Sequence, residues 1–320
     1  MRALSVLFPA FCHGLREPDP EFQREALALE DLGIPWHVVN IPALKSGDVA
    51  GAFRFFGEAP LSPMIYRGWI LHPEEFAALH AALSQRGCRL LTSPAAYRHA
   101  LLFPEFFPAI ADHSFPAVWI TGKDPDQAIK VALQLGSGPY FIKDFAKSAK
   151  EIWPKGCVAA NAQELPTAIQ ALVEYRADRF EGGIVIRPLM RLRCLEESPF
   201  GGKIFEEYRF FFFQGRLISK TAYDRASGAV AALPDYGFLP QRIRSTFFSA
   251  DVVITESGQP YLLEAGDGGS SALPPLASAA DFYKTILDIL ASGRLQDTTA
   301  NISPEPPTAG ACIGSGVFKP

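Results

Sequence analysis

The sequence lacks the cysteine and histidine patterns that hold structural zinc or form a disulfide framework. Its five cysteines are scattered and never spaced as Cys-x-x-Cys, and its six histidines are dispersed. This use of cysteine is typical of a reducing compartment, so we expect a cytoplasmic protein without structural zinc. The chain also lacks an apolar run of the roughly 20 residues that a membrane-spanning helix needs. We therefore predict no membrane segment.

Two nucleotide-binding motifs are missing as well. No Gly-x-Gly-x-x-Gly follows the first predicted strand, and the chain contains no Gly-x-x-x-x-Gly-Lys-Ser/Thr. Their absence argues against a nicotinamide-binding Rossmann domain and a P-loop kinase. The formal net charge of −4 gives no general reason to expect binding to nucleic acid or to an anionic membrane.

With 320 residues, the chain is long enough to bury a large core in two or three subdomains. Its first part alternates strand-like segments with amphipathic helical ones that begin after Asp19-Pro20 and His72-Pro73. This alternation predicts a small parallel α/β unit over residues 1–93. The strands expected in this unit span 3–8, 36–41, 63–71 and 88–92.

Beyond this unit we expect a connector over 94–137, because four prolines interrupt any long helix between 94 and 116. Two α+β segments follow, over 138–190 and 191–291, each with strand-like runs and helical patterns. The remaining residues, 292–320, are rich in Pro, Gly, Thr and Ala and have few large apolar side chains. This composition predicts a mostly disordered tail.

The clearest local signal for chemistry is a hairpin in which Asp251–Thr255 and Pro260–Ala265 flank the turn Ser257-Gly258. With a two-residue loop, the expected partners are Asp251 with Glu264, Val252 with Leu263, and Val253 with Leu262. The two carboxylates would then lie with Cβ atoms roughly 5 Å apart. Facing like charges destabilise a hairpin, so the pair favours a bound cation.

A third carboxylate, Asp267, follows in a glycine-rich segment where the backbone can bend toward the same ion. Oxygen ligands of this kind suit Mg²⁺. We therefore predict a metal site formed by Asp251, Glu264 and Asp267. The alternative is that Asp251 begins an edge strand, that Glu264 is solvated and that the glycines form an ordinary loop.

Several basic side chains are candidates for binding phosphate or another anion. Lys143 ends an apolar strand and Lys147 lies in the loop after it, so both could converge on phosphates, although a solvated basic turn is the alternative. Arg209 shares a strand face with Glu207, and either contacts a transferring phosphate or pairs with that carboxylate. Arg67 lies in a β-rich run, where it either binds an anionic substrate or forms a structural ion pair.

The order of these segments resembles the ATP-grasp superfamily over about residues 3–290. The most specific motifs are Lys143-Asp144-Phe145-Ala146-Lys147-Ser148 and Leu263-Glu264-Ala265-Gly266-Asp267-Gly268. Both resemble the R2K clade of that superfamily, which is named for one arginine and two lysines. The resemblance implies an ATP-grasp fold, in which a Rossmann-like pre-ATP-grasp unit precedes two α+β subdomains that clasp a nucleotide.

The resemblance also implies roles for individual residues. The magnesium carboxylates, for two Mg²⁺ ions, would be Asp251 and Glu264. The phosphate-binding and catalytic side chains would be Lys143, Lys147 and Arg209, and the hinge that meets adenine would be Ile186, Arg187 and Pro188. The clade arginine corresponds to Arg67, Arg187 or Arg209. Many ATP-grasp enzymes have Glu-x-Asn at the last metal position, whereas here the third acid, Asp267, comes one residue later.

The function implied is an ATP- and Mg²⁺-dependent carboxylate–amine ligase that works through an acyl phosphate. Its substrates would be a small-molecule or peptide carboxylate and an amine, such as an amino acid, a peptide or a protein end. Two alternatives remain. One is a phosphotransferase or nucleotidyl-transferring enzyme on the same fold, and the other is a nucleotide-binding module without catalysis.

Overall fold

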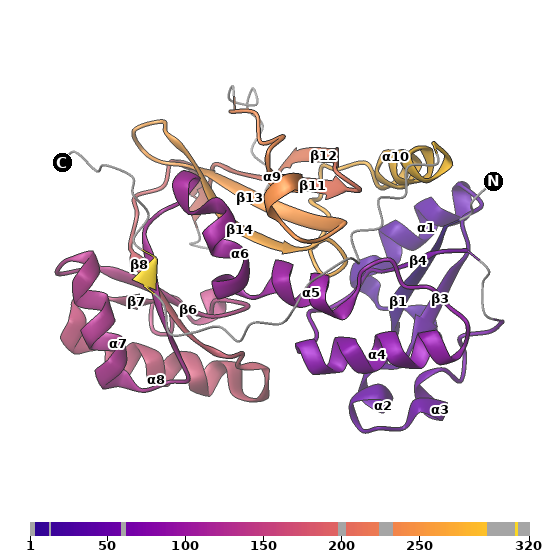
Figure 1. Cartoon of the computed structure of the whole chain (residues 1–320), viewed down its shortest axis with the longest axis horizontal. Helices are drawn as coiled ribbons and strands as arrows, with labels where there is room; N and C mark the ends of the chain where they lie inside the picture. Colours follow the sequence, from indigo (N-terminus) through magenta and orange to yellow (C-terminus); the bar gives the residue numbers. More distant parts are fainter. Residues whose placement is uncertain are drawn as a thin grey trace.

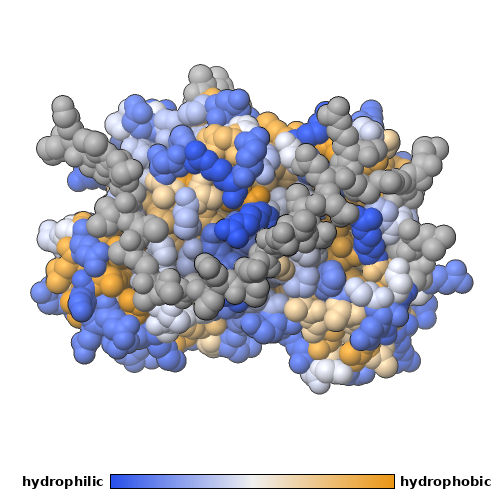
Figure 2. Space-filling view, viewed as in Figure 1, coloured by the Kyte–Doolittle hydropathy of each residue, from blue (hydrophilic) through white to orange (hydrophobic). Residues whose placement is uncertain are grey.

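The computed structural model describes residues 4–12, 14–58, 62–197, 203–223, 233–292 and 311–312. They form an N-terminal unit, a small subdomain and a large subdomain (Figure 1). In the described ranges no helix has both the length and the apolar character needed to cross a membrane. Hydrophilic side chains cover much of the face shown in Figure 2, and an apolar area lies at its lower left, over α7 (Pro125–Ala132).

The N-terminal unit is built around β1, which pairs in parallel with β3 and β4. Its strands are β1 (Ser5–Phe11), β2 (Gly14–Pro18), β3 (Trp36–Val39) and β4 (Met64–Tyr66). Its helices are α1 (Gln23–Asp31), α2 (Ile41–Lys45), α3 (Val49–Ala52) and α4 (Pro73–Gln85). The predicted parallel pairing is confirmed for β1, β3 and β4, whereas β2, which was not predicted, pairs with β1 in antiparallel fashion. The strand expected over 88–92 is reduced to a single bridge between Met64 and Leu90.

The first part of the expected connector is helical. It contains α5 (Pro94–Leu101) and α6 (Phe103–Ile110). Pro94 and Pro104 occupy the first turns of these helices, where a missing N–H costs little. The prolines therefore start the two helices, and only Pro108 lies in a helix interior.

The small subdomain contains a five-stranded sheet in the order β15-β5-β8-β6-β7. These strands are β5 (Ala117–Thr121), β6 (Tyr140–Asp144), β7 (Val158–Ala159), β8 (Gly183–Pro188) and β15 (Ala311–Cys312). One face packs on α7 and α8 (Leu165–Arg176) through a separate apolar core. Both β5 and α7 come from the expected connector, and most of the predicted tail lies outside the described residues.

The large subdomain is an antiparallel sheet in the order β12-β11-β13-β14. Its strands are β11 (Glu207–Phe213), β12 (Arg216–Ala222), β13 (Phe247–Ile254) and β14 (Pro260–Asp267), with α9 (Leu239–Arg242), α10 (Ala279–Ala291) and the small hairpin β9 (Cys194–Glu197) and β10 (Lys203–Phe205) beside them. Phe210 and Phe212 belong to the core that also contains α5 and α6. Phe211 on the opposite face packs against Phe282 of α10.

The register of β13 and β14 confirms the most important predicted pair, since Asp251 faces Glu264. The other two predicted pairs are wrong by one residue, because Val252 faces Leu262 and Val253 faces Tyr261. The register shifts between Asp251 and Val252, as a bulge in one strand requires. Asp251 lies within a central strand and does not begin an edge strand.

The N-terminal unit is joined to the small subdomain by His72, the residue that precedes α4. Its Nδ1 lies 2.6 Å from Glu181 Oε2 and its Nε2 lies 2.7 Å from the Asp178 carbonyl oxygen. Both partners are acceptors, so both ring nitrogens donate when the imidazole is charged. Partial burial opposes the charge, but the bonds to Glu181 and Asp178 outweigh it and raise the pKa of His72.

This contact predicts a pH-dependent contribution to stability. Because the pKa of His72 is raised in the folded state, the stabilisation is complete below the ordinary histidine pKa and is lost as the pH rises through the folded value. Glu181→Gln should therefore lower the free energy of unfolding by about 1 kcal/mol at pH 5.5 and by much less at pH 9. Urea unfolding at both pH values measures the difference, and an equal loss at both would contradict the prediction.

Candidate functional site

Three charged side chains form a row across the large sheet. Arg209 on β11 faces Asp251 on β13, and Asp251 faces Glu264 on β14. Partners in neighbouring strands point to the same side of a sheet. The hairpin geometry therefore places both predicted carboxylates and the predicted arginine together.

The repulsion between these carboxylates is balanced by two cations. Arg209 binds Asp251 in a bidentate manner, with Nε 2.8 Å from Oδ1 and Nη2 2.7 Å from Oδ2. Lys143 Nζ, which comes from β6 of the small subdomain, lies 2.8 Å from Glu264 Oε2. Lys143 is therefore not part of a solvated turn, and Arg209 pairs with Asp251 and not with Glu207.

The two carboxylates differ in exposure. The Asp251 side chain is 3% exposed, whereas that of Glu264 is 36% exposed and can be reached from solvent. Desolvation alone would raise the pKa of Glu264, but the charge and hydrogen bond of Lys143, with the charges of Lys150 and Arg209, lower it to about 2. Glu264 is therefore ionised at neutral pH and available to bind a cation.

Sequence reasoning did not select two further charged residues of this site. Glu207 shares the strand face of Arg209, and burial together with the charge of Asp251 raises the pKa of Glu207 to about 7. Lys150 follows β6, and the carboxylates of Glu207 and Glu264 raise the pKa of Lys150 against the effect of desolvation. The sequence signal for Lys150 was the basic run after Lys143, and the signal for Glu207 was the strand face that it shares with Arg209. Neither signal shows that the two side chains lie close together, because they come from different subdomains.

Lys147, the second predicted lysine, lies in the loop after β6 with an exposed side chain. Asp144 shapes this loop, since its Oδ1 accepts the Ala146 and Lys147 N–H groups at 2.8 and 2.5 Å. Its Oδ2 lies 2.7 Å from Arg176 Nε. The structure thus brings Lys143 to Glu264, whereas the Lys147 side chain is exposed in the loop after β6.

Asp267 lies on the opposite face of the sheet from Asp251 and Glu264. It faces Phe248, and its Oδ1 accepts the N–H groups of Gly269 and Ser270 at 2.8 and 3.0 Å. Burial raises the pKa of Asp267 to about 7. Over the described ranges, no group of three or more His, Cys, Asp or Glu side chains gathers where it could hold a metal ion. The pair Asp251 and Glu264 remains as the carboxylate part of the candidate site.

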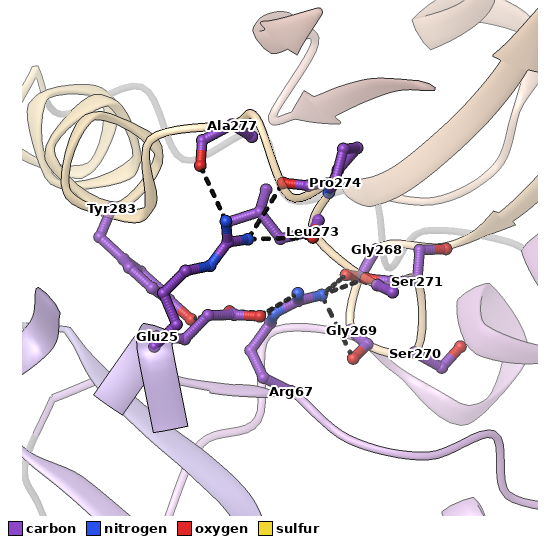
Figure 3. A network of polar contacts seen from close by, with 12 residues as sticks. Glu25, Arg67, Gly268, Gly269, Ser270, Ser271, Leu273, Pro274, Ala277 and Tyr283 are labelled. Atoms are coloured by element: carbon purple, nitrogen blue, oxygen red, sulfur yellow. Dashed lines mark hydrogen bonds and ion pairs between the residues drawn. The ribbon is translucent and has the colours of Figure 1, made fainter. Parts of the chain in front are cut away.

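Arg67 is fully buried, and its guanidinium binds groups of the protein itself (Figure 3). It donates to both oxygens of Glu25 at 2.8 and 2.7 Å, and to the carbonyl oxygens of Gly268 and Ser271 at 2.5 and 2.7 Å. Tyr283 donates to the same carboxylate. Arg67 therefore forms a structural ion pair with Glu25, which is the second of the two roles expected for it.

The predicted adenine hinge ends strand β8, on the small sheet. Ile186 belongs to the core under α7 and α8, and Pro188 is partly exposed. Arg187 lies on the other face, where it donates to the carbonyl oxygens of Leu263 and Phe115 at 2.8 and 3.0 Å. Burial lowers its pKa to about 10. Arg187 therefore connects the small sheet to the strand that carries Glu264.

Solved structures with a similar fold include ATP-grasp proteins. An ATP-grasp RimK domain protein from Sphaerobacter thermophilus is 17% identical, with a TM-score of 0.54 over 89% of this chain and 100% of that one. D-alanyl-alanine synthetase A from Vibrio cholerae is 13% identical, with a TM-score of 0.54 over 91% and 98%. The ATP-grasp ligase PsnB, complexed with a minimal precursor, Mg and ADP, is 12% identical, with a TM-score of 0.52 over 90% and 97%.

These likenesses show that the protein has the ATP-grasp fold, as the sequence motifs predicted. Residues 134–286 match the family model of the ATP-grasp domain, R2K clade family 3. The matched segment carries Lys143, Arg209, Asp251 and Glu264. No curated protein matches the chain significantly.

The geometry of Arg67 predicts a large effect on stability. Arg67→Met leaves Glu25 buried without its cation, so the free energy of unfolding should fall by about 3–5 kcal/mol. The double variant Glu25→Gln/Arg67→Met removes the uncompensated charge and should recover part of this loss. Urea unfolding monitored by circular dichroism measures both. Wild-type stability in Arg67→Met would contradict the structural role.

Proposed function

We propose that the protein is an ATP- and Mg²⁺-dependent carboxylate–amine ligase that releases ADP and phosphate through an acyl phosphate. The observation that carries this proposal is the convergence of Lys143 from the small subdomain with Arg209, Asp251 and Glu264 from the large one. In the ATP-grasp fold, nucleotide would lie between these two subdomains. Two carboxylates and two cations then face the phosphates.

The donor set fits magnesium. Asp251 and Glu264 are side by side on neighbouring strands, and both offer carboxylate oxygens, which Mg²⁺ prefers. When bound, Mg²⁺ would neutralise charge on the β- and γ-phosphate oxygens. A structure of the similar ligase PsnB contains Mg and ADP. We propose that Asp251 and Glu264 hold the magnesium ions, and we leave Asp267 out because it lies on the other face.

The basic residues would bind the phosphates of ATP and stabilise the charge that develops during the reaction. Lys143 is paired with Glu264 and can turn to the phosphates of ATP, where its charge would stabilise ADP as it leaves. Lys147 and Lys150, in the loop after β6, would add charge from the other side. Arg209 would orient the γ-phosphoryl group while the substrate carboxylate attacks it. We propose that the hinge at Ile186–Pro188 meets the adenine ring.

The proposed reaction has two steps. A carboxylate oxygen of the acid substrate attacks the γ-phosphorus, the bond to the β–γ bridging oxygen breaks, and ADP leaves. The neutral amine then attacks the carbonyl carbon of the acyl phosphate, phosphate leaves with the electrons of the C–O bond, and the amine loses one proton. No side-chain nucleophile is needed, since catalysis rests on positioning and charge.

The substrate class follows from the similar proteins and remains broad. One is a D-alanyl-alanine synthetase, and another was solved with a precursor, which is a peptide in the related complex with PsnA2. We propose an amino acid, peptide or protein end as the acid or amine. Cys12, Cys88, Cys157 and Cys194 are free thiols in the structure, which supports a cytoplasmic location.

Purified protein should convert ATP to ADP and phosphate when supplied with pools of amino acids and peptides, and a joined product should appear with the mass of its two parts minus one water. Lys143→Met and Glu264→Gln should each lower this turnover by about 100-fold or more. Matched controls are Lys130→Met and Glu174→Gln, which are exposed on helices α7 and α8. They should retain wild-type turnover.

Other reaction products would support one of the alternative functions. Release of AMP and pyrophosphate would exclude an ADP-forming acyl phosphate. A phosphorylated or nucleotidylated acceptor without a new amide would indicate a transferase. Background turnover that is equal in wild type and Glu264→Gln, with nucleotide still bound, would indicate a non-catalytic module.

A further inference from the structure

The strand face that carries Asp251 and Glu264 continues to Ser249 and Gly266, which also face each other. Gly266 is two residues after Glu264 and has no side chain that could bind a cation. A Cβ atom at this position would lie 2.8 Å from Ser271 Oγ and 3.0 Å from Ser249 Oγ. Two serine hydroxyls therefore fill the space into which a side chain at position 266 would project.

The hydrogen bonds of this pair leave one oxygen available. Ser271 Oγ donates to the Asp267 carbonyl oxygen at 2.8 Å, and the two hydroxyl oxygens are 2.7 Å apart. Each hydroxyl has one proton, so Ser249 must donate to Ser271. Within the described part of the chain this is the only hydrogen bond of the Ser249 hydroxyl, and its lone pairs remain free.

The free oxygen lies on the strand face that carries the two carboxylates. Ser249 is two residues before Asp251 on the same strand, so their side chains leave the sheet on the same side, roughly 7 Å apart along the strand. Ser249 is 2% exposed, as is Asp251. A hydroxyl oxygen is a hard, neutral donor of the type that Mg²⁺ accepts beside carboxylates.

The N-terminal unit holds the second serine in place. Arg67 donates to the carbonyl oxygens of Gly268 and Ser271, so a cation from another part of the chain fixes the loop that carries Ser271 (Figure 3). Ser271 in turn takes up the proton of Ser249. The arrangement fixes the orientation of the Ser249 oxygen as well as its position.

We propose that Ser249 is an oxygen ligand of the magnesium ion held by Asp251 and Glu264, and that it supplies the donor that Gly266 lacks. The inference rests on the proposed function, because it assumes a metal-dependent nucleotide site. Ser271 is the positioning residue, since its own hydroxyl proton is bonded to the Asp267 carbonyl. If the two serines only filled space, their removal would have similar and small effects on metal binding.

The first test measures metal binding without turnover. Mn²⁺ is titrated into protein with saturating ADP, and free Mn²⁺ is followed by electron paramagnetic resonance. Ser249→Ala should weaken Mn²⁺ binding by about 10-fold, as loss of a group that supports a metal site does. Ser84→Ala is the matched control, because Ser84 is exposed on α4, and it should leave Mn²⁺ binding unchanged. Equal affinities for wild type and Ser249→Ala would overturn the proposal.

The second test changes the chemistry of the donor and keeps its size. Ser249→Cys replaces a hard oxygen with a soft sulfur, which favours Cd²⁺ over Mg²⁺. The ratio of Cd²⁺ to Mg²⁺ affinity in the ADP complex should rise by about 10-fold or more for a thiol ligand. The same substitution at the exposed Ser84 should leave the ratio unchanged. An unchanged ratio in folded Ser249→Cys protein would also overturn the proposal.

Binding of ADP and Mn²⁺ to the wild type separates the proposed function from the role of Ser249. If the folded wild type binds neither ADP nor Mn²⁺, the proposed function is wrong and the role of Ser249 is wrong with it. If the wild type binds both and Ser249→Ala binds Mn²⁺ equally well, only the role of Ser249 is wrong.

Discussion

Two carboxylates that face each other on neighbouring strands, Asp251 and Glu264, are the constraint on which the candidate site depends. Facing like charges repel, and partial removal from water strengthens the repulsion. The protein balances them with Arg209 from the same sheet and Lys143 from the small subdomain. The site is therefore electrostatically complete only when the two subdomains approach, which is also the geometry that the proposed nucleotide site requires.

The N-terminal unit supports this site from the side of the glycine-rich loop. Arg67 binds the carbonyl groups of Gly268 and Ser271, and Arg24 donates to those of the following residues, such as Leu273. The backbones approach closely here, because a Cβ atom at Gly269 would lie 2.4 Å from the Tyr66 carbonyl oxygen. Charge in this unit is thus used to fix the backbone behind the site, and the loop keeps its shape.

Much of the candidate site could be predicted because its signals are local. The predicted pair of Asp251 and Glu264 is present, although the loop is one residue longer than predicted, since the Thr255 N–H donates to the Gln259 carbonyl oxygen, and the bulge restores the pair. The alternation of β11 places Arg209 on one face. The predicted register between Asp251 and the loop was wrong because the position of a bulge depends on packing and has no clear sequence signal. Lys150 and Glu207 were missed because their electrostatic partners lie on other segments.

The sequence by itself determined the order of strands and helices, the acidic pair and the resemblance to the ATP-grasp superfamily. Only the tertiary structure decided that Asp267 lies on the opposite face, that Arg67 binds Glu25, and that Lys143 reaches Glu264. The physical reason is the range of the forces involved. Turn chemistry and strand alternation act over a few residues, whereas the partner of a charge depends on which distant segments the packed core brings together.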